Sequence, residues 1–278
     1  MQEDLSEEEF LRGYDITKYP RPSLTVDIVT FGVTGEAERN YRQDEKKTLS
    51  LLLIKRGGHP CRGKWALPGG FLNMDETLEE CAFRELREET DLRPAALMPM
   101  GSFSQVDRDP RGRVISSSYI SIVDEENVRA LAGDDAAEAK WFTIDFSDAD
   151  KNGWRKLTLR NAEEDITLHA DLREERTQFG RSKYELREGG DLAFDHAKII
   201  ATAYGIIRKS GNDFETLFDF MPELFTLSGL QKVQETLLGT TVQAANFRRK
   251  VMPLVEETDK STSGAGHRPA KLYRRKKM

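Results

Sequence analysis

Apolar stretches in the first half of the chain predict a β-sheet. Leu24 to Phe31 and Thr48 to Ile54 are rich in apolar residues, and the second stretch is so continuously apolar that we expect it at the centre of the sheet. Ala95 to Val106 and Ile115 to Ile122 flank residues 107–113, which contain turn-forming Asp-Pro and Gly-Arg pairs. These two stretches predict a hairpin-like pair of strands with a basic tip.

Between these strands, a periodic segment predicts an amphipathic helix from about Glu76 to Thr90. Its apolar face is built from Leu78, Cys81 and Ala82, which stand at helical spacing. The same row continues to Glu85 and Glu89, so a face that should keep burying itself turns acidic. This change points to a functional surface at the end of the helix.

Later segments extend this first unit. Ala139 to Phe142 should form its closing strand, and Trp154 to Leu186 alternates in the manner of strands, which predicts an inserted hairpin. Leu192 to Arg208 predicts a helix with one apolar face. His196 lies on that face, where a lone histidine is more often a hydrogen-bonded core residue than a catalyst.

The last quarter of the chain has a different pattern. Thr226 can cap a helix over Leu227 to Leu238 that stops at a glycine, and a short turn then leads into a helix containing the basic run Asn246 to Lys250. Met252 to Glu257 and Lys271 to Arg274 can pair as a β-hairpin across a segment rich in Gly, Ser and Thr. This is the outline of a winged helix-turn-helix.

Charge is distributed unevenly along the chain. Residues 241–278 contain ten Lys or Arg against three Asp or Glu, a net charge of +7, so the remainder carries −13 of the total of −6. An acidic body with a basic end suggests that the end meets a polyanion while the body handles another ligand.

Composition favours a globular protein. A chain of 278 residues, 38% of them hydrophobic, can build one large domain or two. It has no run of 18 apolar residues, and its acidic start lacks the order of a signal peptide, so we expect a cytoplasmic protein with no membrane partner. Two cysteines, Cys61 and Cys81, argue against a disulfide framework, and Cys61 with nearby His59 is too sparse for a zinc site.

Three glutamates of the predicted helix are candidates for a metal site. Glu85, Glu88 and Glu89 fall on one arc of the helix, where their repulsion raises the pKa of at least one carboxyl unless a cation lies among them. Such oxygen ligands suit Mg²⁺ or Mn²⁺ together with substrate phosphate. The alternative is a solvated helix on which Glu80, Arg84 and Glu88 form ion pairs of about 0.2–0.5 kcal/mol each.

The spacing of these residues resembles the Nudix box. Gly70, Glu76 and the run Arg84 to Glu89 stand at the offsets of that motif, directly after Trp65 to Gly70, and this favours the metal site over the ion-paired helix. One position departs from the pattern, because Asp91 stands where the family normally has Gly. That position closes a helix and often needs a left-handed residue, which Asp tolerates at some cost.

Three further segments narrow the resemblance. Phe194 to Ala197, Asn246 to Lys250 and His267 to Tyr273 are similar to the NrtR-type Nudix-related transcriptional regulators, and the resemblance covers nearly everything from residue 22 onward. It implies an α+β protein with a Nudix α/β/α sandwich around a mixed sheet and a C-terminal winged helix-turn-helix domain. The expected parts are a polar, irregular N-terminal tail (1–20), a Nudix domain (21–210, with an inserted hairpin at about 151–190) and a winged helix domain (211–278).

The resemblance also implies the site residues. Arg84 would orient the carboxylates, and Glu85, Glu88 and Glu89 would hold Mg²⁺ or Mn²⁺ around a diphosphate. Substrate-binding candidates are Arg56, Gly70, Arg108 and Arg111, although each arginine could equally be an exposed loop residue. DNA-binding candidates are Asn246, Arg248, Arg249, Lys250, Arg268, Lys271, Arg274 and Arg275, the last two of which also fit a merely solvated tail.

Two hypotheses from different classes follow. In the first, the chain is a homodimeric transcriptional regulator whose Nudix domain binds ADP-ribose or a related sugar nucleotide and thereby alters affinity for double-stranded operator DNA. In the second, it is a Mg²⁺-dependent ADP-ribose or nucleoside-diphosphate-sugar pyrophosphatase whose winged helix serves dimerisation or substrate selection. Both can hold, since the box is nearly intact, but a basic winged helix has little use in plain hydrolysis.

Overall fold

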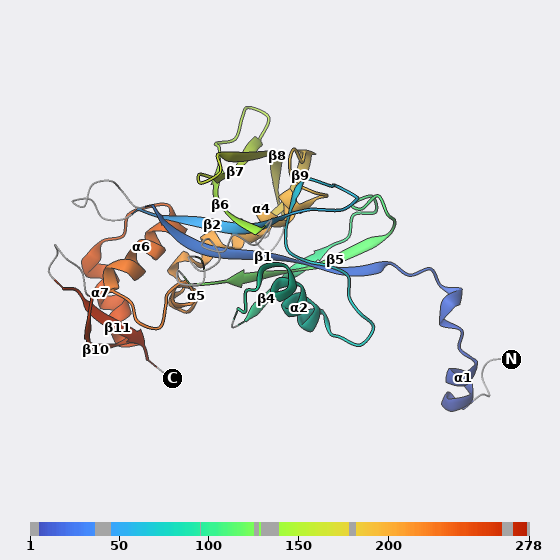
Figure 1. Cartoon of the computed structure of the whole chain (residues 1–278), viewed down its shortest axis with the longest axis horizontal. Helices are drawn as coiled ribbons and strands as arrows, with labels where there is room; N and C mark the ends of the chain where they lie inside the picture. The colour runs from blue at the N-terminus through green and yellow to red at the C-terminus, as the bar shows by residue number, and fades with distance from the viewer. Residues whose placement is uncertain are drawn as a thin grey trace.

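Three regions follow one another along the molecule: an N-terminal arm, a sheet between helices, and a smaller helical unit with a hairpin (Figure 1). The computed structural model describes residues 6–36, 46–94, 96–124, 128, 139–177, 182–262 and 269–276. The strands of the central region up to residue 146 are β1 (Ser23–Glu36), β2 (Lys46–Lys55), β3 (Trp65–Ala66), β4 (Leu97–Phe103), β5 (Val114–Ile122) and β6 (Ala139–Phe146).

A single mixed sheet forms the body of the molecule. Its strands follow the order β4-β5-β1-β2-β6-β7-β8-β9, with β3 paired to β2. β1 and β5 run parallel, whereas β4 and β5 form the antiparallel pair that the turn chemistry predicts. β2 lies between β1 and β6, and Leu51, Leu52 and Leu53 are fully buried there. The prediction that the continuously apolar stretch is central is therefore confirmed.

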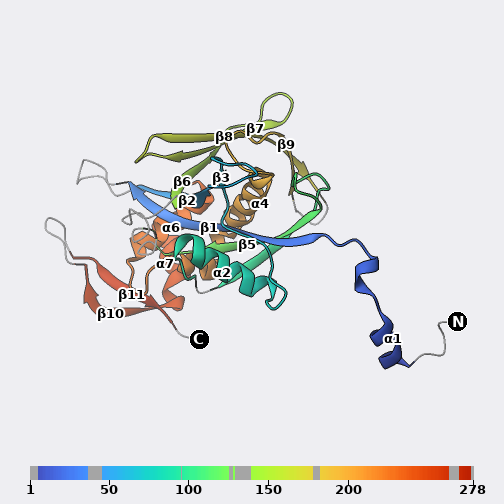
Figure 2. The same cartoon turned by 45° about the vertical axis from the view of Figure 1, so that its right-hand side comes forward.

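Helices cover both faces of this sheet, so the predicted α/β/α sandwich is confirmed (Figure 2). Successive residues of a strand point to opposite faces, and β1 accordingly sends Ile28 toward α2 (Leu78–Thr90) and Phe31 toward α4 (His196–Lys209). On the α2 side the buried helix residues include Cys81, Ala82 and Leu86, as the periodicity of the sequence predicts.

The helix of the box begins and ends with specific caps. The Thr77 hydroxyl accepts a hydrogen bond from the Glu80 amide, and the Glu80 carboxylate accepts one from the Thr77 amide, which together form a capping box. At the other end Asp91 is left-handed, with φ of 55°, and its amide donates to the Arg87 carbonyl. The expectation of a left-handed residue at position 91 is therefore confirmed.

The segment after β6 differs from the prediction. β6 does not close the sheet, because β7 (Trp154–Asn161), β8 (Ile166–Arg176) and β9 (Ser182–Glu188) extend the same sheet beyond it. β7 and β8 form the predicted hairpin, and β9 adds a third strand to it. The extension packs on α4 through residues such as Leu168 and Leu172, so it supports that helix.

The C-terminal unit has the predicted winged helix-turn-helix order. It consists of α5 (Phe214–Asp219), α6 (Leu227–Leu238), α7 (Ala244–Val251), β10 (Val255–Ser261) and β11 (Lys271–Arg275). Thr226 caps α6 through the Gly229 amide, and the helix ends at left-handed Gly239. β10 and β11 pair antiparallel as the wing. The buried residues of this unit are continuous with the α4 side of the sheet.

The N-terminal arm contains a helix where an irregular tail was expected. α1 (Glu7–Gly13) is capped by Ser6, whose side chain and that of Glu9 form a capping box, and this Ser-x-x-Glu signal could have been found in the sequence. The arm stands away from the sheet in each whole-chain view, and none of the α1 residues is buried (Figures 1 and 2). No helix among the described residues is long and apolar enough to cross a membrane.

Candidate nucleotide site and candidate DNA interface

Two glutamates of the box helix reach the loop that precedes it. The Glu89 carboxylate accepts a hydrogen bond from the Gly69 amide at 2.8 Å. The Glu85 carboxylate lies so close to Gly70 that a β-carbon there would be 2.2 Å from Glu85 Oε1. Gly69 likewise has its α-carbon against the Val26 carbonyl, with φ of 153°. Gly70 therefore leaves room for the Glu85 carboxylate, and Gly69 leaves room for the loop to lie against β1.

Arg84 holds the remaining box carboxylates in place. Its guanidinium forms two hydrogen bonds with Glu76, at 2.7 and 2.9 Å, and one with Glu85 at 2.7 Å, and it reaches Glu88 at 3.3 Å. It also donates to the Phe71 carbonyl, which connects the helix to the loop. This geometry agrees with the expected orienting role and exceeds what an isolated ion pair on a solvated helix would provide.

The surroundings of two of these carboxyls shift their pKa values in opposite directions. Burial, together with the nearby carboxylates of Glu85 and Asp27, raises the pKa of Glu89 to about 7, although the hydrogen bond from the Gly69 amide opposes this rise. The hydrogen bonds from Arg84 lower the pKa of Glu76 to about 2. Glu76 is thus fixed as an anion, whereas Glu89 lies among negative charges that a cation would offset.

The donor set fits a divalent cation in its chemistry. Glu85 and Glu89 offer carboxylate oxygens against the same Gly69–Gly70 backbone, which suits a hard cation. No three His, Cys, Asp or Glu side chains in the described ranges are already gathered around one metal position. Glu85 and Glu88 are instead turned toward Arg84, so Glu88, whose side chain is 54% exposed, would have to turn away from it to join a metal.

Two predicted arginines stack on aromatic rings beside these carboxylates. The guanidinium of Arg111 lies 4.8 Å from the ring centre of Phe71 and 5.7 Å from that of Phe194. Arg56 lies 5.0 Å from the Phe194 ring and donates to the Pro60 carbonyl at 2.9 Å. The structure therefore brings Arg56 and Arg111 together around one phenylalanine, with contacts of the cation–π kind.

Arg108 is placed differently from the other two arginines. Its side chain is only 4% exposed and forms hydrogen bonds to Asp195 at 2.7 and 3.1 Å and to Asp27 at 3.3 Å. Asp27 also accepts from the Ser116 hydroxyl. Arg108 is therefore not an exposed loop arginine. Its guanidinium is also not free to contact a ligand, because it already binds two carboxylates.

His196 belongs to the same buried network. Its Nδ1 accepts a hydrogen bond from the Leu67 amide at 2.9 Å, and its Nε2 lies 3.3 Å from Asp27. Because the ring is fully enclosed, burial lowers the pKa of His196 and keeps the ring neutral, despite the opposing effect of Asp27 and Asp195. The interpretation of His196 as a hydrogen-bonded core residue is confirmed.

Four residues of this region were missed in the sequence. Asp27 is a lone charge inside an apolar strand, which is a signal that could have been noticed. Asp195 and Phe194 were seen only as part of a family-like segment, and Phe71 only as the residue after the glycines. Their roles depend on contacts across the fold that periodicity does not report.

The second predicted site is the basic face of α7. Arg248, Arg249 and Lys250 are exposed, while Phe247 and Val251 on the same helix are buried and anchor it. Within the described part of the chain, none of these three cations takes part in an ion pair. Exposed cations on the second helix of a helix-turn-helix are suited to contact DNA phosphates or base edges. Asn246 is also exposed and donates to Gln243 at 2.7 Å.

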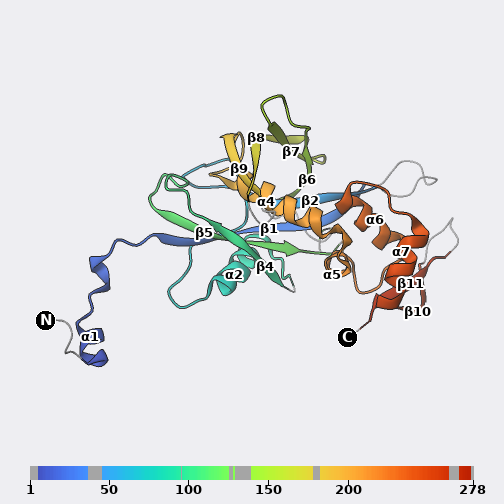
Figure 3. The same ribbon diagram turned by 180° about the vertical axis from the view of Figure 1, so that it is seen from behind.

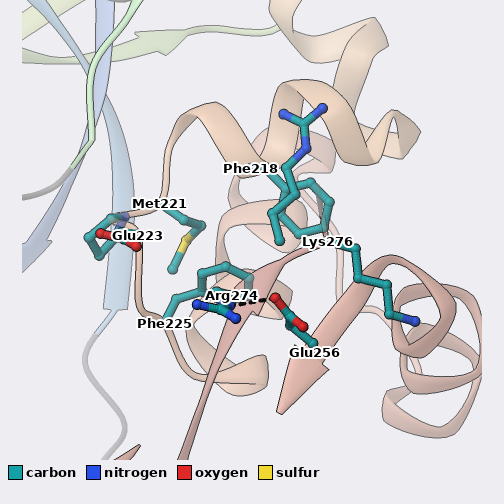
Figure 4. A pocket seen from close by; sticks show the side chains of 9 residues that line it. Phe218, Met221, Glu223, Phe225, Glu256, Arg274 and Lys276 are labelled. Atoms are coloured by element: carbon teal, nitrogen blue, oxygen red, sulfur yellow. Dashed lines mark hydrogen bonds and ion pairs between the residues drawn. The ribbon is translucent and has the colours of Figure 1, made fainter. Parts of the chain in front are cut away.

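The wing cations, in contrast, are already paired. Lys271 forms an ion pair with Glu257, Arg274 with Glu256, and Arg275 with Glu215 of α5. Figure 4 shows the Arg274–Glu256 pair at a cavity of about 690 Å³, whose apolar wall includes Phe218, Met221 and Phe225. The first two pairs connect the two strands of the wing, and the third joins the wing to α5. The predicted residue Arg268 lies outside the described residues.

Comparison with known proteins matches both halves of the chain. Residues 40–161 match the NUDIX domain, and residues 217–275 match the NrtR DNA-binding winged helix domain. The chain is 30% identical over 273 residues, 97% of its length and 88% of the relative's, to the ADPR responsive transcriptional repressor NtrR of Acinetobacter baylyi. The chain belongs to the family of NrtR-type Nudix-related transcriptional regulators.

Two more similarities bear on the two halves of this NrtR-type chain. The structure of Shewanella oneidensis NrtR complexed with a 27mer DNA has a TM-score of 0.62 and 27% identity, covering 91% of this chain and 93% of that one. The ADP-ribose pyrophosphatase of Methanocaldococcus jannaschii is 46% identical over 99 residues, 36% of this chain and 57% of the enzyme. Nudix hydrolases generally use a divalent metal, and the box carboxylates described above fit that use.

Proposed function

We propose that this protein is a transcriptional regulator whose Nudix domain binds ADP-ribose or a related nucleoside diphosphate sugar and thereby changes its affinity for operator DNA. The observation that carries the proposal is the presence, in one chain, of an assembled carboxylate–arginine site and an exposed basic helix α7. Because one surface suits a diphosphate with its metal and the other a nucleic acid, a ligand-responsive DNA-binding protein accounts for both.

The ligand would lie between the box loop and the aromatic–arginine cluster. Arg56 and Arg111 stack on the Phe194 ring, and their guanidinium edges offer donors that suit phosphate or ribose oxygens. Gly70 lets the Glu85 carboxylate lie against the backbone of the box loop, beside which the diphosphate and its metal would bind. Arg108 would take part only by exchanging Asp195 or Asp27 for a phosphate oxygen.

A DNA-binding titration tests this proposal. Fluorescent duplexes that tile the region upstream of the protein's own gene are titrated with the full chain at moderate salt, with and without ADP-ribose. We expect one duplex to bind more tightly than its neighbours and ADP-ribose to change that affinity by at least about fivefold, the lower end of common allosteric couplings. Equal binding to all duplexes, or a DNA affinity that does not change when ADP-ribose is added, would contradict the proposal.

Hydrolysis of the bound nucleotide is a second activity that the box geometry favours. Mg²⁺ or Mn²⁺ held by Glu85, Glu88 and Glu89 would polarise a phosphorus-bound oxygen and help to supply hydroxide. Arg84 fixes Glu76 and Glu85 in position. The Gly69 amide donates to the Glu89 carboxylate and holds it near Glu85, where a cation would offset the repulsion between the two.

Release of AMP from ADP-ribose in the presence of Mg²⁺ tests this second activity. Glu88→Gln and Glu89→Gln should each lower kcat by about 10²-fold or more, since each removes a charge or proton acceptor from the reacting region. Glu79→Gln provides the matched control, because Glu79 is exposed on the same helix. Unchanged turnover in both glutamate variants would remove them from the catalytic site.

The DNA-binding form would be a homodimer. Helix-turn-helix proteins commonly read two half-sites with two copies of one chain, and cyclic dimers are the commonest homo-oligomers. Asn246, Arg248, Arg249 and Lys250 would meet the groove or its phosphates in the cytoplasm, with the wing cations beside them. Sedimentation equilibrium of the full chain and its DNA complex tests the dimer, and a monomer bound to one half-site would contradict it.

A further inference from the structure

One helix touches both of the regions that the proposed function connects. α4 begins beside Asp195 and His196 in the buried arginine network and ends at Lys209, next to α5 and α6 of the winged helix unit (Figure 3). Its 14 residues span about 21 Å at 1.5 Å per residue. The helix is thus long enough to carry a displacement from one region to the other.

The N-terminus of α4 is held without its normal cap. Asp195 occupies the N-cap position, where an aspartate usually accepts a hydrogen bond from the first turn of the helix. Here the Asp195 side chain caps nothing, and Arg108 binds it instead at 2.7 and 3.1 Å. Asp195 therefore has two potential partners, the Arg108 guanidinium and the first turn of α4, and in this structure its carboxylate binds the first and does not cap the second.

The residue before Asp195 is also held in a costly conformation. Phe194 has φ of 50°, a left-handed conformation that is strained for a non-glycine residue. Arg56 and Arg111 stack on its ring at 5.0 and 5.7 Å. Arg56, Arg108 and Arg111, which contact Phe194 or Asp195, are the three arginines predicted from the sequence to bind an anionic ligand.

The opposite end of α4 is joined directly to the winged helix unit. Arg208 donates to the Thr236 carbonyl at 3.0 Å and to the Leu238 carbonyl at 2.8 Å, and so caps the C-terminus of α6. Gly211 packs so closely that a β-carbon there would be 2.8 Å from the Leu238 side chain. A movement of this end of α4 would therefore carry α6 with it, and α6 precedes the basic helix α7.

Space for such a movement lies next to this joint. A groove of about 460 Å³ lies between the β4–β5 part of the sheet and α5, and Ile207 and Ser210 at the end of α4 line it together with Leu97 and Phe218. A close-packed joint would resist displacement. The C-terminal end of α4 packs against α6 on one side and borders the groove on the side of β4 and β5, so it has room to move toward the groove.

We propose that α4 transmits the ligand signal to the winged helix. An anionic ligand that draws Arg56, Arg108 and Arg111 toward its phosphates frees Asp195 to cap α4 and releases Phe194, and Arg208 passes the resulting shift to α6. This inference rests on the proposed function, because it names the route by which ADP-ribose would change DNA affinity. Two alternative partners of Asp195 provide the discrete states that such a route needs.

Arg208→Gln tests the route far from both ligands. DNA affinity is measured with and without ADP-ribose, with divalent metal omitted so that the nucleotide is not consumed. In the variant, the ligand-induced change in DNA Kd should fall below about twofold, whereas the wild type gives at least about fivefold. The Kd for ADP-ribose should stay within about threefold of wild type, as expected for a residue outside the ligand site.

Arg187→Gln is the matched control, because Arg187 lies on β9, packs on Trp154, and touches neither Arg108 nor α6. It should keep the full ligand-induced change. If Arg208→Gln also keeps that change, the route is overturned while the proposed function stands. If wild-type protein shows no ligand-induced change, the proposed function falls first and the route falls with it.

Hydrogen exchange on wild-type protein keeps the test decisive should Arg208→Gln fail to bind DNA. Saturating ADP-ribose should change amide exchange several-fold in the first turn of α4, residues 196–200, and at its junction with α6, residues 207–212. A ligand that changes DNA affinity while exchange in both stretches stays constant would overturn the route. By linkage, the duplex alone should alter ADP-ribose Kd by the same factor.

Discussion

The cations at the two ends of the molecule differ in what holds them. At the candidate nucleotide site, Arg84, Arg108 and Arg111 each already bind a carboxylate of the same chain. On α7, Arg248 and Arg249 are exposed and, within the described part of the chain, form no ion pair. We infer that a ligand at the nucleotide site would have to replace carboxylates already bound to these arginines, whereas a polyanion could bind the cations of α7 without breaking an ion pair.

The largest effect should come from breaking a buried pair. Arg108→Gln leaves the carboxylates of Asp27 and Asp195, about 90% buried, without their cation. We expect the free energy of unfolding to fall by about 3–5 kcal/mol, the scale for removing one partner of a buried pair. Urea denaturation at neutral pH measures the change.

Arg173→Gln is the matched control for that experiment. The Arg173–Glu185 pair is more than 40% exposed on both sides, so its loss should cost at most about 1 kcal/mol. Equal losses in the two variants would show that the Arg108 network does not stabilise the fold, and the contrast between the two ends would disappear.

The next effect concerns DNA binding by the cations of α7. Changing Arg248 and Arg249 together to Ala should flatten the salt dependence of DNA binding by about two units in the plot of log K against log salt, since each phosphate contact contributes about one. Fluorescence anisotropy at several salt concentrations measures this slope.

The wing provides the comparison for the double variant. Arg275 is engaged by Glu215, so Arg275→Ala should change the slope less than either α7 arginine does. A slope that depends on the wing residue and not on α7 would reverse our assignment of the DNA-binding surface.

Local patterns in the sequence predicted much of this architecture. The apolar run at Thr48 to Ile54 marked the central strand, and the Thr226 cap and Gly239 stop marked α6 at its observed limits, because these signals are local. The box spacing likewise located the carboxylates. What the sequence did not predict is the pairing of Arg108 with Asp195, 87 residues away, since separation along the chain carries no information on such contacts.

Two elements differ from the sequence prediction for different reasons. The prediction of Ala139 to Phe142 as the closing strand assumed that the sheet ends there. The alternating residues after Trp154 extend the sheet instead, because the edge of a strand can pair with any further strand of suitable pattern. In the arm, the Ser6–Glu9 box was a readable helix signal that the polar composition obscured. The prediction failed there through an unused local signal.

A smaller effect is the pH dependence of stability, which we expect from the buried network of the nucleotide site and not from the arginines of α7. Burial lowers the pKa of His196 below 6.5, its value in the unfolded chain. Four charged residues face the ring: Asp27 and Asp195 oppose this shift, and Arg108 and Arg56 add to it. As pH falls through about 6.5, the unfolded chain therefore takes up the proton first, and the free energy of unfolding falls by at most about 1.4 kcal/mol per pH unit. The arginines of α7 keep their charge throughout this range.

Denaturation between pH 5 and 7.5 measures this dependence. His196→Gln should flatten it, because the variant has no imidazole to protonate, whereas His59→Gln at an exposed loop position should leave the slope unchanged. A slope that persists in His196→Gln would assign the pH dependence to other groups.

The smallest effect compares how a helix ends in each region. α2 ends at Asp91 and α6 at Gly239, both left-handed, with φ of 55° and 68°. Only glycine adopts this conformation without a steric penalty, so Asp91→Gly should raise the free energy of unfolding by about 0.5–1 kcal/mol. Asp91→Asn, which tolerates the conformation nearly as well as Asp, should leave stability close to wild type.

The reverse change at Gly239 should be more harmful. A β-carbon there would lie 2.2 Å from the Arg208 guanidinium, so Gly239→Ala adds a clash with the residue that joins α4 to α6 to the cost of the left-handed backbone. Thermal unfolding of both variants measures the asymmetry. If neither Asp91→Gly nor Gly239→Ala changes the melting temperature, the two helix ends tolerate substitution equally. The close contact between Arg208 and Gly239 would then not constrain the junction of α4 and α6.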